Sequence, residues 1–287
     1  MQLGLPDSYP STCALPFNRE SFEQQFQLST PDQDPGGEGY WLLLEGQKLV
    51  TSNDPQTPEL LQQLPAELNT RSALYIGNYL ERPCRLLMLK SDDHLTPGCS
   101  LQATDPQITL PLLSLAGVAL MINHWERSSR FCGYCGGHLS RLEREWGKKC
   151  QECGKIHFPR IHPCVIGLIV KNDEILLVRK PEWVKGRFGL VAGFVEFGES
   201  LEQAMSREIM EETGITVDNL RYIGSQSWPF PSQIMHGFVC DYVNGDLQLQ
   251  EDELEEGGWY KLDALPTLPP QRSIARYLID SASSYIP

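Results

Sequence analysis

The sequence predicts an α+β protein in three parts, and three observations support this prediction. Strand-like runs rich in Leu, Ile and Val occur in both halves of the chain, at 73–78, 84–90, 164–170 and 174–179. Apolar residues recur every three or four positions in three stretches that we expect to be helical, 110–125, 201–212 and 273–282. Between the halves, two C-x2-C pairs predict a small metal-bound segment. We expect the parts to be 1–126, 127–160 and 161–287.

The composition excludes several classes of protein. The 287 residues are enough for more than one domain, and the net charge of −13 argues against a nucleic-acid binder with a basic surface. The longest apolar stretch, Ile108–Ile122, contains Pro111 and is too short to span a bilayer. Met1–Pro16 lacks the pattern of a signal peptide. The odd number of cysteines, nine, favours a reducing cytoplasm over a disulfide framework.

An acidic pattern dominates Gly193–Ile215, which reads G-x5-E-x7-R-E-U-x-E-E-x-G-U with U an aliphatic residue. On the expected helix, Glu208 and Glu212 lie one turn apart with Glu211 beside them, along the border of the apolar stripe. Carboxylates at these spacings repel one another, and a cation would hold them together. Because oxygen ligands favour hard ions, we expect Mg²⁺ or Mn²⁺ here.

Two residues are expected to shape this segment. Glu199, in the loop before the helix, is expected to pair with Arg207. Gly214 is the expected helix stop, because glycine readily adopts a left-handed backbone. The alternative is a solvated acidic helix face, which would not require both glycines and every charged position of the pattern.

The two C-x2-C pairs are separated by 14 residues and consist of Cys132, Cys135, Cys150 and Cys153. Four thiolates at this spacing suit a closed, tetrahedral Zn²⁺ site with a structural role, one ion per chain. Disulfide or redox pairing is the alternative. The other cysteines are expected to be ordinary thiols: Cys13, Cys84, Cys99, Cys164 and Cys240.

A loop rich in aromatic residues and proline follows the acidic pattern, at Ser225–Gln233 (SQSWPFPSQ). Proline restricts the backbone around Trp228 and Phe230, so these rings are candidates to stack on a flat heterocycle. In the alternative interpretation, the loop packs on its own aromatic rings.

These motifs together carry a resemblance. Gly193–Ile215 matches the Nudix box in full, and Ser225–Gln233 resembles the S-Q-P-W-P-F-P-x-S signature of the NADH pyrophosphatase family of Nudix hydrolases. That family also has a four-cysteine ribbon and an N-terminal domain. The resemblance implies a Nudix α/β/α sandwich with a mixed sheet, preceded by a zinc ribbon and a small α+β domain. Ser227 and Gln233 depart from the signature.

The resemblance also implies a function. It is the metal-dependent cleavage of the diphosphate of NAD(H) into nicotinamide mononucleotide and AMP, together with removal of the NAD cap from the 5′ end of RNA. A homodimer is implied as well. Two alternatives stay open: hydrolysis of another nucleoside diphosphate such as ADP-ribose, and a non-catalytic Nudix-like sensor. The aromatic loop argues against the first alternative, and the complete set of box carboxylates argues against the second.

Site residues follow from the matched positions. The implied ligands of Mg²⁺ or Mn²⁺ are the Ala192 carbonyl and the side chains of Glu208, Glu211, Glu212 and Glu253. Glu212 is the expected general base, with Glu211 as the alternative. Phe194 is the expected stacking partner of the nicotinamide, and Phe158 stands where the family has a tyrosine donated across the dimer interface. Expected substrate contacts also include Glu145, Gln226, Ser227, Trp228, Pro229, Phe230, Pro231, Ser232, Gln233 and Ala275.

Overall fold

The computed structural model describes residues 3–52, 54, 58–68, 71–90, 93 and 98–286. The chain forms two compact units. The first unit contains Pro16–Ile161, the beginning of the chain and the short segment Trp228–Ser232. The second unit contains His162–Ser227 and the chain from Gln233 onward, together with Pro6–Leu15. The aromatic loop therefore crosses from one unit to the other and back.

The first unit is built on a six-stranded sheet with the order β1-β4-β5-β2-β3-β6. Its strands are β1 (Phe26–Leu28), β2 (Tyr40–Glu45), β3 (Lys48–Val50), β4 (Leu74–Tyr79), β5 (Arg82–Met88) and β6 (Gly98–Ser100). Strands β2 and β5 are parallel, and the other pairs are antiparallel. The helix α1 (Leu110–Ser128) contributes Leu112, Leu115 and Ala119 to the core that it shares with the sheet.

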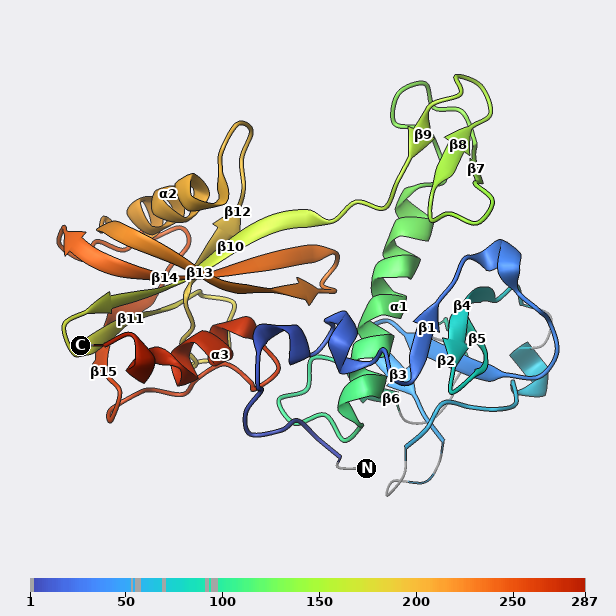
Figure 1. Ribbon diagram of the computed structural model, residues 1–287, viewed down its shortest axis with the longest axis horizontal. Coiled ribbons are helices and arrows are strands. Elements are labelled where there is room, and N and C mark those ends of the chain that lie inside the picture. Colours follow the sequence, from blue (N-terminus) through green and yellow to red (C-terminus); the bar gives the residue numbers. More distant parts are fainter. Residues whose placement is uncertain are drawn as a thin grey trace. The chain divides into compact units, whose positions relative to one another are not determined.

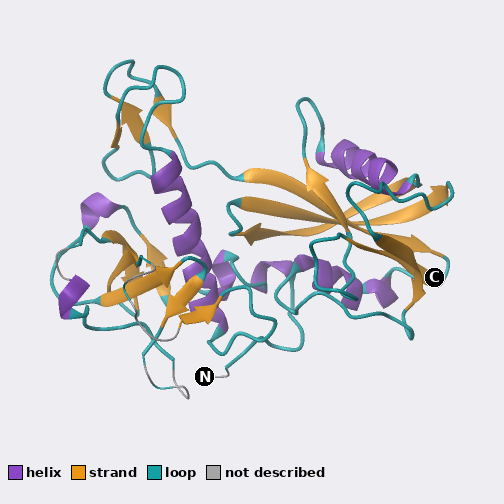
Figure 2. Cartoon of the chain, turned by 180° about the vertical axis from the view of Figure 1, so that it is seen from behind, coloured by secondary structure: helices purple, strands orange, loops and turns teal. Residues whose placement is uncertain are grey.

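A three-stranded antiparallel ribbon lies at the C-terminal end of α1 (Figures 1 and 2). Its strands are β7 (Leu139–Arg141), β8 (Lys148–Cys150) and β9 (Ile156–His157). The first unit also has short 3-10 helices at Arg19–Ser21, Pro31–Gln33 and Ala66–Leu68. The ribbon has few buried apolar side chains of its own, so it needs another source of stability, such as a metal ion.

The second unit is built on a mixed sheet with the order β13-β14-β10-β11-β15, and β12 pairs with β10. Its strands are β10 (His162–Lys171), β11 (Glu174–Arg179), β12 (Val191–Phe194), β13 (Thr216–Trp228), β14 (Gln233–Asn244) and β15 (Glu256–Lys261). Strands β10 and β14 are parallel, whereas β10 is antiparallel to β11 and to β12. The mixed sheet is thereby confirmed.

Helices cover both faces of this sheet: α2 (Leu201–Thr213) lies on one side and α3 (Ile274–Asp280) on the other (Figure 1). The alternation of side chains along β10 explains both cores. Val165 and Ile169 pack in the cluster that contains Met205 of α2. Ile166 and Leu168 pack in the cluster that contains Leu278 of α3. This arrangement confirms the predicted α/β/α sandwich.

Most expected elements are present close to their predicted bounds, and the expected strands β10 and β11 form a hairpin that turns at Asn172. Asn172 has the positive φ of 55° that such a turn requires. The strand that enters the Nudix box begins at Val191, and the preceding segment 183–190 forms two isolated bridges, from Arg187 to Thr267 and from Gly189 to Val178. No helix among the described residues has an apolar run long enough to cross a membrane.

Candidate functional site

The acidic helix α2 is defined at both ends by local chemistry. At its start, the Ser200 hydroxyl accepts a hydrogen bond from the Gln203 backbone N–H, while the Gln203 side chain accepts one from the Ser200 N–H. This reciprocal pair is a capping box. At its end, Gly214 has a φ of 70°, a left-handed conformation that glycine adopts without steric cost. Both boundaries agree with the predicted helix.

Arg207 organises one half of the carboxylate cluster. Its guanidinium donates to Glu199 from Nε at 2.6 Å and from Nη2 at 3.0 Å, as the sequence predicted. Nη1 donates to Glu208 and to Glu211, both at 2.9 Å. Nη2 also donates to the carbonyl oxygen of Phe194 at 2.9 Å. One side chain therefore connects the loop before α2, the end of β12 and two of the proposed metal ligands.

The close approach of the Glu208 side chain to β12 explains why the Nudix box has glycine at position 193. A Cβ atom at this position would lie 2.0 Å from the carboxyl carbon of Glu208. Such a contact is impossible, so any larger residue would displace the Glu208 side chain or the strand. The backbone of β12, including the neighbouring Ala192, therefore runs directly beside the carboxylate cluster.

Lys180 contacts the other two carboxylates of the cluster, and no pattern in the sequence indicated this contact. It follows directly after β11, and its Nζ lies 3.3 Å from Glu212 Oε1 and 2.9 Å from Glu253 Oε2. Glu212 belongs to α2, whereas Glu253 belongs to the turn before β15. The two carboxylates are 41 positions apart in the sequence and meet at one ammonium group. A lysine after a predicted strand is too common to have identified this contact.

Burial and hydrogen bonds shift the pKa values of the carboxyl groups in this cluster in opposite directions. Burial raises the pKa of Glu212 to about 7, although Lys180 opposes the shift. Burial also raises the pKa of Glu208, against the effect of Arg207. In contrast, the hydrogen bonds from Arg207 lower the pKa of Glu199 to about 2. Glu199 is therefore a permanent anion at neutral pH, whereas Glu212 is poised to exchange a proton.

One carboxylate oxygen of the cluster is suited to a divalent cation. Glu212 is 2% exposed, and its Oε2 atom is buried without a hydrogen-bond partner among the described residues. A buried carboxylate oxygen without a partner is costly, and a bound cation would satisfy it. The neighbouring side chains offer only carboxylate oxygens, the ligands that Mg²⁺ and Mn²⁺ prefer.

The four ribbon cysteines form a second site. Their ligand atoms all lie within 4.8 Å of one another, which suits a tetrahedral Zn²⁺ ion. The backbone N–H of Cys135 lowers the pKa of Cys132 to about 7, and that of Cys153 does the same for Cys150, whereas hydrogen bonds with the neighbouring thiols raise the pKa of Cys135. Lowered thiol pKa values favour the thiolates that bind the metal. His157 adds a contact outside the four, with its Nε2 3.2 Å from the Cys132 sulfur.

Two exposed aromatic residues lie at the C-terminal end of β12 and in the loop that follows it. Phe194, at the end of β12, is 52% exposed, and its ring lies edge-on to His162 with 6.4 Å between centroids. Phe197, in the loop between β12 and α2, is fully exposed. Because the carbonyl of Phe194 is held by Arg207, the backbone that carries its ring is tied to the carboxylate cluster.

The aromatic loop packs inside the first unit. Trp228 and Phe230 each lie edge-on to Phe17, with centroids 5.9 Å apart, and both join the apolar core that includes α1. Pro229 is buried and lies close to Gly117 of α1. These contacts agree with the second interpretation of the loop, in which its rings pack on other aromatic rings of the protein. The sequence did not indicate that Phe17 would be the partner.

The other residues of the loop and of α3 have varied surroundings. Gln226 is fully buried: its amide nitrogen donates to the Arg272 carbonyl and its amide oxygen accepts from the Ile274 N–H, both at 2.7 Å. Its side chain is thus committed to the start of α3. Ser232 and Ala275 are buried. The remaining loop positions Ser227, Pro231 and Gln233 are at least partly exposed.

Two predicted substrate contacts lie in the ribbon of the first unit. Glu145, in the turn between β7 and β8, is exposed, and so is Phe158, which follows β9. These residues and Phe194 belong to different compact units of the chain. Their proposed participation in one substrate site therefore depends on the resemblance.

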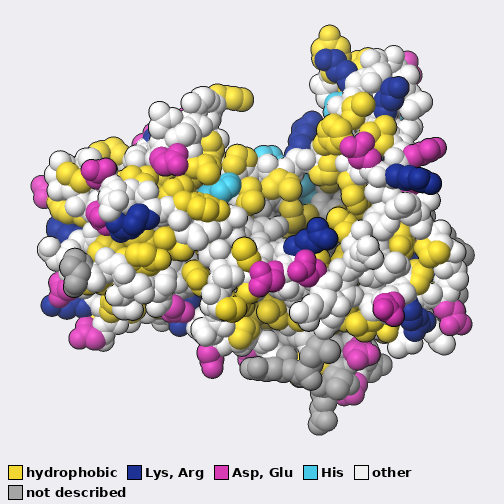
Figure 3. Space-filling model, viewed as in Figure 1, with side chains coloured by type: hydrophobic (Ala, Val, Ile, Leu, Met, Phe, Trp, Pro, Cys, Tyr) yellow, Lys and Arg dark blue, Asp and Glu magenta, His cyan; other side chains and the backbone are white. Residues whose placement is uncertain are grey.

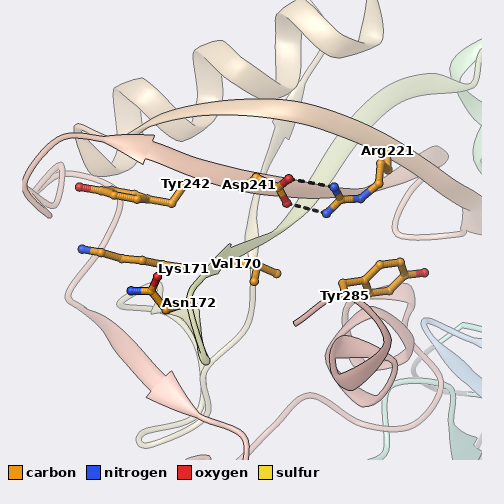
Figure 4. Close-up of a pocket in the computed structure, with 7 residues that line it drawn as sticks. All are labelled: Val170, Lys171, Asn172, Arg221, Asp241, Tyr242 and Tyr285. Carbon is orange, nitrogen blue, oxygen red and sulfur yellow. Dashed lines mark hydrogen bonds and ion pairs between the residues drawn. The ribbon is translucent and has the colours of Figure 1, made fainter. Parts of the chain in front are cut away.

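A separate pocket of about 320 Å³ lies elsewhere on the second unit, and seven residues line it (Figure 4). Its carboxylate, Asp241, accepts two hydrogen bonds from Arg221, and Lys171 lies against the ring of Tyr242. This pocket contains none of the Nudix box residues. Lys, Arg, Asp and Glu side chains are interspersed on the face that Figure 3 shows.

Comparison with known proteins agrees with this geometry. The NUDIX domain matches residues 160–281, and the NADH pyrophosphatase zinc ribbon domain matches residues 127–158. These two matches define the class, a Nudix domain preceded by a zinc ribbon. A relative from Photobacterium profundum, named NAD-capped RNA hydrolase NudC, is 39% identical over 86% of this chain and 92% of its own length. The chain belongs to the NudC family of Nudix proteins.

Further relatives carry the same name. The protein from Pseudomonas putida (strain GB-1) is 43% identical over 71% of this chain and 75% of its own length. The protein from Pseudomonas aeruginosa (strain LESB58) is 50% identical over 58% of this chain, and the match spans 60% of that relative. Among solved structures, a NUDIX hydrolase from Nitrosomonas europaea has a TM-score of 0.45 and 25% identity, over 55% of this chain and 90% of its own.

Proposed function

We propose that this protein is a metal-dependent hydrolase of the diphosphate bond of NAD(H), which releases nicotinamide mononucleotide and AMP. We also propose that it removes the NAD cap from the 5′ end of RNA. The observation that carries the proposal is the cluster of Glu208, Glu211, Glu212 and Glu253, with the buried and unsatisfied oxygen of Glu212. The names of the relatives support this choice of substrate.

The carboxylates are proposed to hold Mg²⁺ or Mn²⁺ with the Ala192 carbonyl. A bound divalent cation neutralises the diphosphate and polarises phosphorus toward attack by water. Glu212 is the proposed general base from its matched position in the Nudix box, and its carboxylate is buried within the cluster. Glu211 is the less suited alternative, because its side chain is 55% exposed and paired with Arg207.

The other roles are proposals on the same basis. Phe194 is proposed to stack on the nicotinamide ring, because its exposed ring is carried by backbone that Arg207 holds beside the cluster. Phe158 and Glu145 are proposed to contact substrate from the ribbon, with Phe158 acting across a homodimer. The four cysteines are proposed to bind one structural Zn²⁺. A cytoplasmic location is proposed from the free thiols.

The aromatic loop is proposed to shape the substrate site mainly as a support. Trp228, Pro229 and Phe230 are anchored in an apolar core, and Gln226 is bonded to the start of α3. The start and the middle of the loop are thereby held, and Ser227, Pro231 and Gln233, which are at least partly exposed, are proposed as substrate contacts. Ser232 and Ala275 are proposed to contribute through the shape of the surrounding surface.

The decisive experiment compares substrates in one assay. The purified chain is incubated with Mg²⁺ or Mn²⁺ and NADH, ADP-ribose or an NAD-capped RNA oligomer. We expect reduced nicotinamide mononucleotide and AMP from NADH, and RNA with a 5′ monophosphate from the capped oligomer. Faster turnover of ADP-ribose than of NADH would replace the NAD proposal with the ADP-ribose alternative. No turnover of any substrate would favour the non-catalytic alternative.

A further inference from the structure

Lys180 makes an unusual pair of contacts for a residue in a metal site. Its ammonium group lies between two carboxylates that we propose as ligands, 2.9 Å from Glu253 Oε2 and 3.3 Å from Glu212 Oε1. Its side chain is 18% exposed. The ammonium carries one positive charge and contacts Glu212 Oε1, beside the Oε2 atom that lacks a hydrogen-bond partner among the described residues, so it competes with a divalent cation for the negative charge of the same carboxylates.

Arg207 differs from Lys180 in this respect. The guanidinium of Arg207 is held by Glu199 and by the carbonyl of Phe194, outside the set of proposed ligands. It therefore has contacts that keep it in place when a cation binds Glu208. For Lys180, the described ion pairs are those with Glu212 and Glu253, so loss of these two contacts frees its head group.

We propose that Lys180 is a positioning residue that acts as an internal cation: it holds Glu253 against Glu212 before metal binds, and its charge opposes the binding of a divalent cation to the same carboxylates. The inference rests on the proposed metal site. Its consequence is a reduced affinity for divalent cations.

Removal of Lys180 has two opposing effects on metal affinity. Without the ammonium, Glu253 loses a tether, and ordering its side chain on binding costs conformational entropy. The same change removes a positive charge within a few ångströms of a doubly charged ion, in a partly buried site where screening is weak. Because the repulsion involves a charge of +2 and the tether concerns a single side chain, we expect the electrostatic effect to be larger.

The test measures Mn²⁺ binding directly, from the electron paramagnetic resonance signal of free Mn²⁺ in the absence of substrate. For Lys180→Met we expect a Kd at least about tenfold lower than for the wild type. Lys180→Arg keeps the charge and is expected to stay within about threefold of the wild type. Lys261→Met is the matched control, because it removes the same charge from the exposed ion pair with Asp173.

The outcomes separate this inference from the proposed function. A Kd for Lys180→Met that equals or exceeds the wild-type value, with Lys261→Met unchanged, would overturn the competing role of Lys180. Thermal unfolding shows whether Lys180→Met is folded. If it is not, Lys180→Gln takes its place in the measurement of the Kd for Mn²⁺. Failure of the chain to hydrolyse NADH would contradict the proposed function only, because Mn²⁺ binding is measured without substrate.

Discussion

Arg207 donates two hydrogen bonds to the carboxylate of Glu199, at 2.6 Å and 3.0 Å, and these bonds lower the pKa of Glu199 to about 2. The ion pair connects the loop before α2 to the helix. A carboxyl group whose folded-state pKa is depressed stabilises the fold above its unfolded pKa, near 4.5, and loses that contribution as the pH falls toward the folded value.

The first prediction is therefore a pH-dependent effect of Glu199→Gln. We expect the variant to unfold at a lower temperature than the wild type at pH 5–7. The difference should shrink as the pH falls from about 4.5 toward 2, because Glu199 becomes protonated in the wild type. Thermal unfolding followed by circular dichroism measures the unfolding temperatures of the variant and the wild type across this pH range. A difference that stays constant across this range would show that the ionised carboxylate is not the source of the effect.

Glu212→Gln tests the proposed general base. The substitution preserves size but removes the ability to take a proton, so we expect kcat for NADH to fall about 10²–10⁴-fold, with an unchanged circular dichroism spectrum. Glu202→Gln, on the exposed first turn of the same helix, is the matched control and should leave turnover unchanged. Activity of Glu212→Gln within tenfold of the wild type would remove Glu212 from the base role.

Phe194→Ala tests stacking on the substrate. Stacking of an aromatic ring on a base contributes about 1–3 kcal/mol, so we expect KM for NADH to rise about 10- to 100-fold with a smaller change in kcat. Phe197→Ala in the same loop provides the control, because it also removes an exposed ring and is not a proposed substrate contact. Equal effects of the two substitutions would argue that loop structure, and not stacking by Phe194, is responsible.

Cys150→Ser tests the zinc site. Its sulfur is one of four ligand atoms that lie within 4.8 Å of one another, so we expect zinc content to fall from about one ion per chain to well below one half. Cys13→Ser replaces an exposed thiol outside the cluster and should retain full zinc content. Atomic absorption on purified protein measures both variants. Full zinc content in Cys150→Ser would contradict the four-cysteine site.

Trp228→Ala tests whether the aromatic loop supports the fold. Because Trp228 packs on Phe17 and Phe230 in the first unit, we expect the substitution to lower the free energy of unfolding by about 2–4 kcal/mol. Urea unfolding followed by circular dichroism provides the measurement. Unchanged stability combined with a large rise in KM would instead assign Trp228 to direct substrate stacking.

Interactions between residues close together in the sequence were predicted, whereas interactions between distant residues were missed. The capping box at Ser200, the stop at Gly214 and the apolar face of α2 depend on residues within a few positions of one another, and the helix was predicted closely. The pair between Glu199 and Arg207 spans one loop and was predicted as well. Lys180 was missed, because its partners Glu212 and Glu253 lie 32 and 73 positions away.

The aromatic loop shows the same limit. Its prolines and rings predicted a rigid segment, but the sequence left open whether the rings face a ligand or a core. Phe17, which lies more than 200 positions earlier, contacts both Trp228 and Phe230. Such a contact depends on how the chain folds back, which no local pattern encodes.

The sequence by itself determined the class of this protein, because the Nudix box, the four cysteines and the alternating apolar strands are patterns of short range that specify helices, turns and ligand types. Only the tertiary structure decided which charges balance the carboxylates and where the aromatic loop packs. Lys180 and Glu212 come from different elements, and their distance is set by the pairing of β11 with its neighbours and the packing of α2 on the sheet. Electrostatic and packing energies depend on distance in space, and sequence separation does not determine that distance.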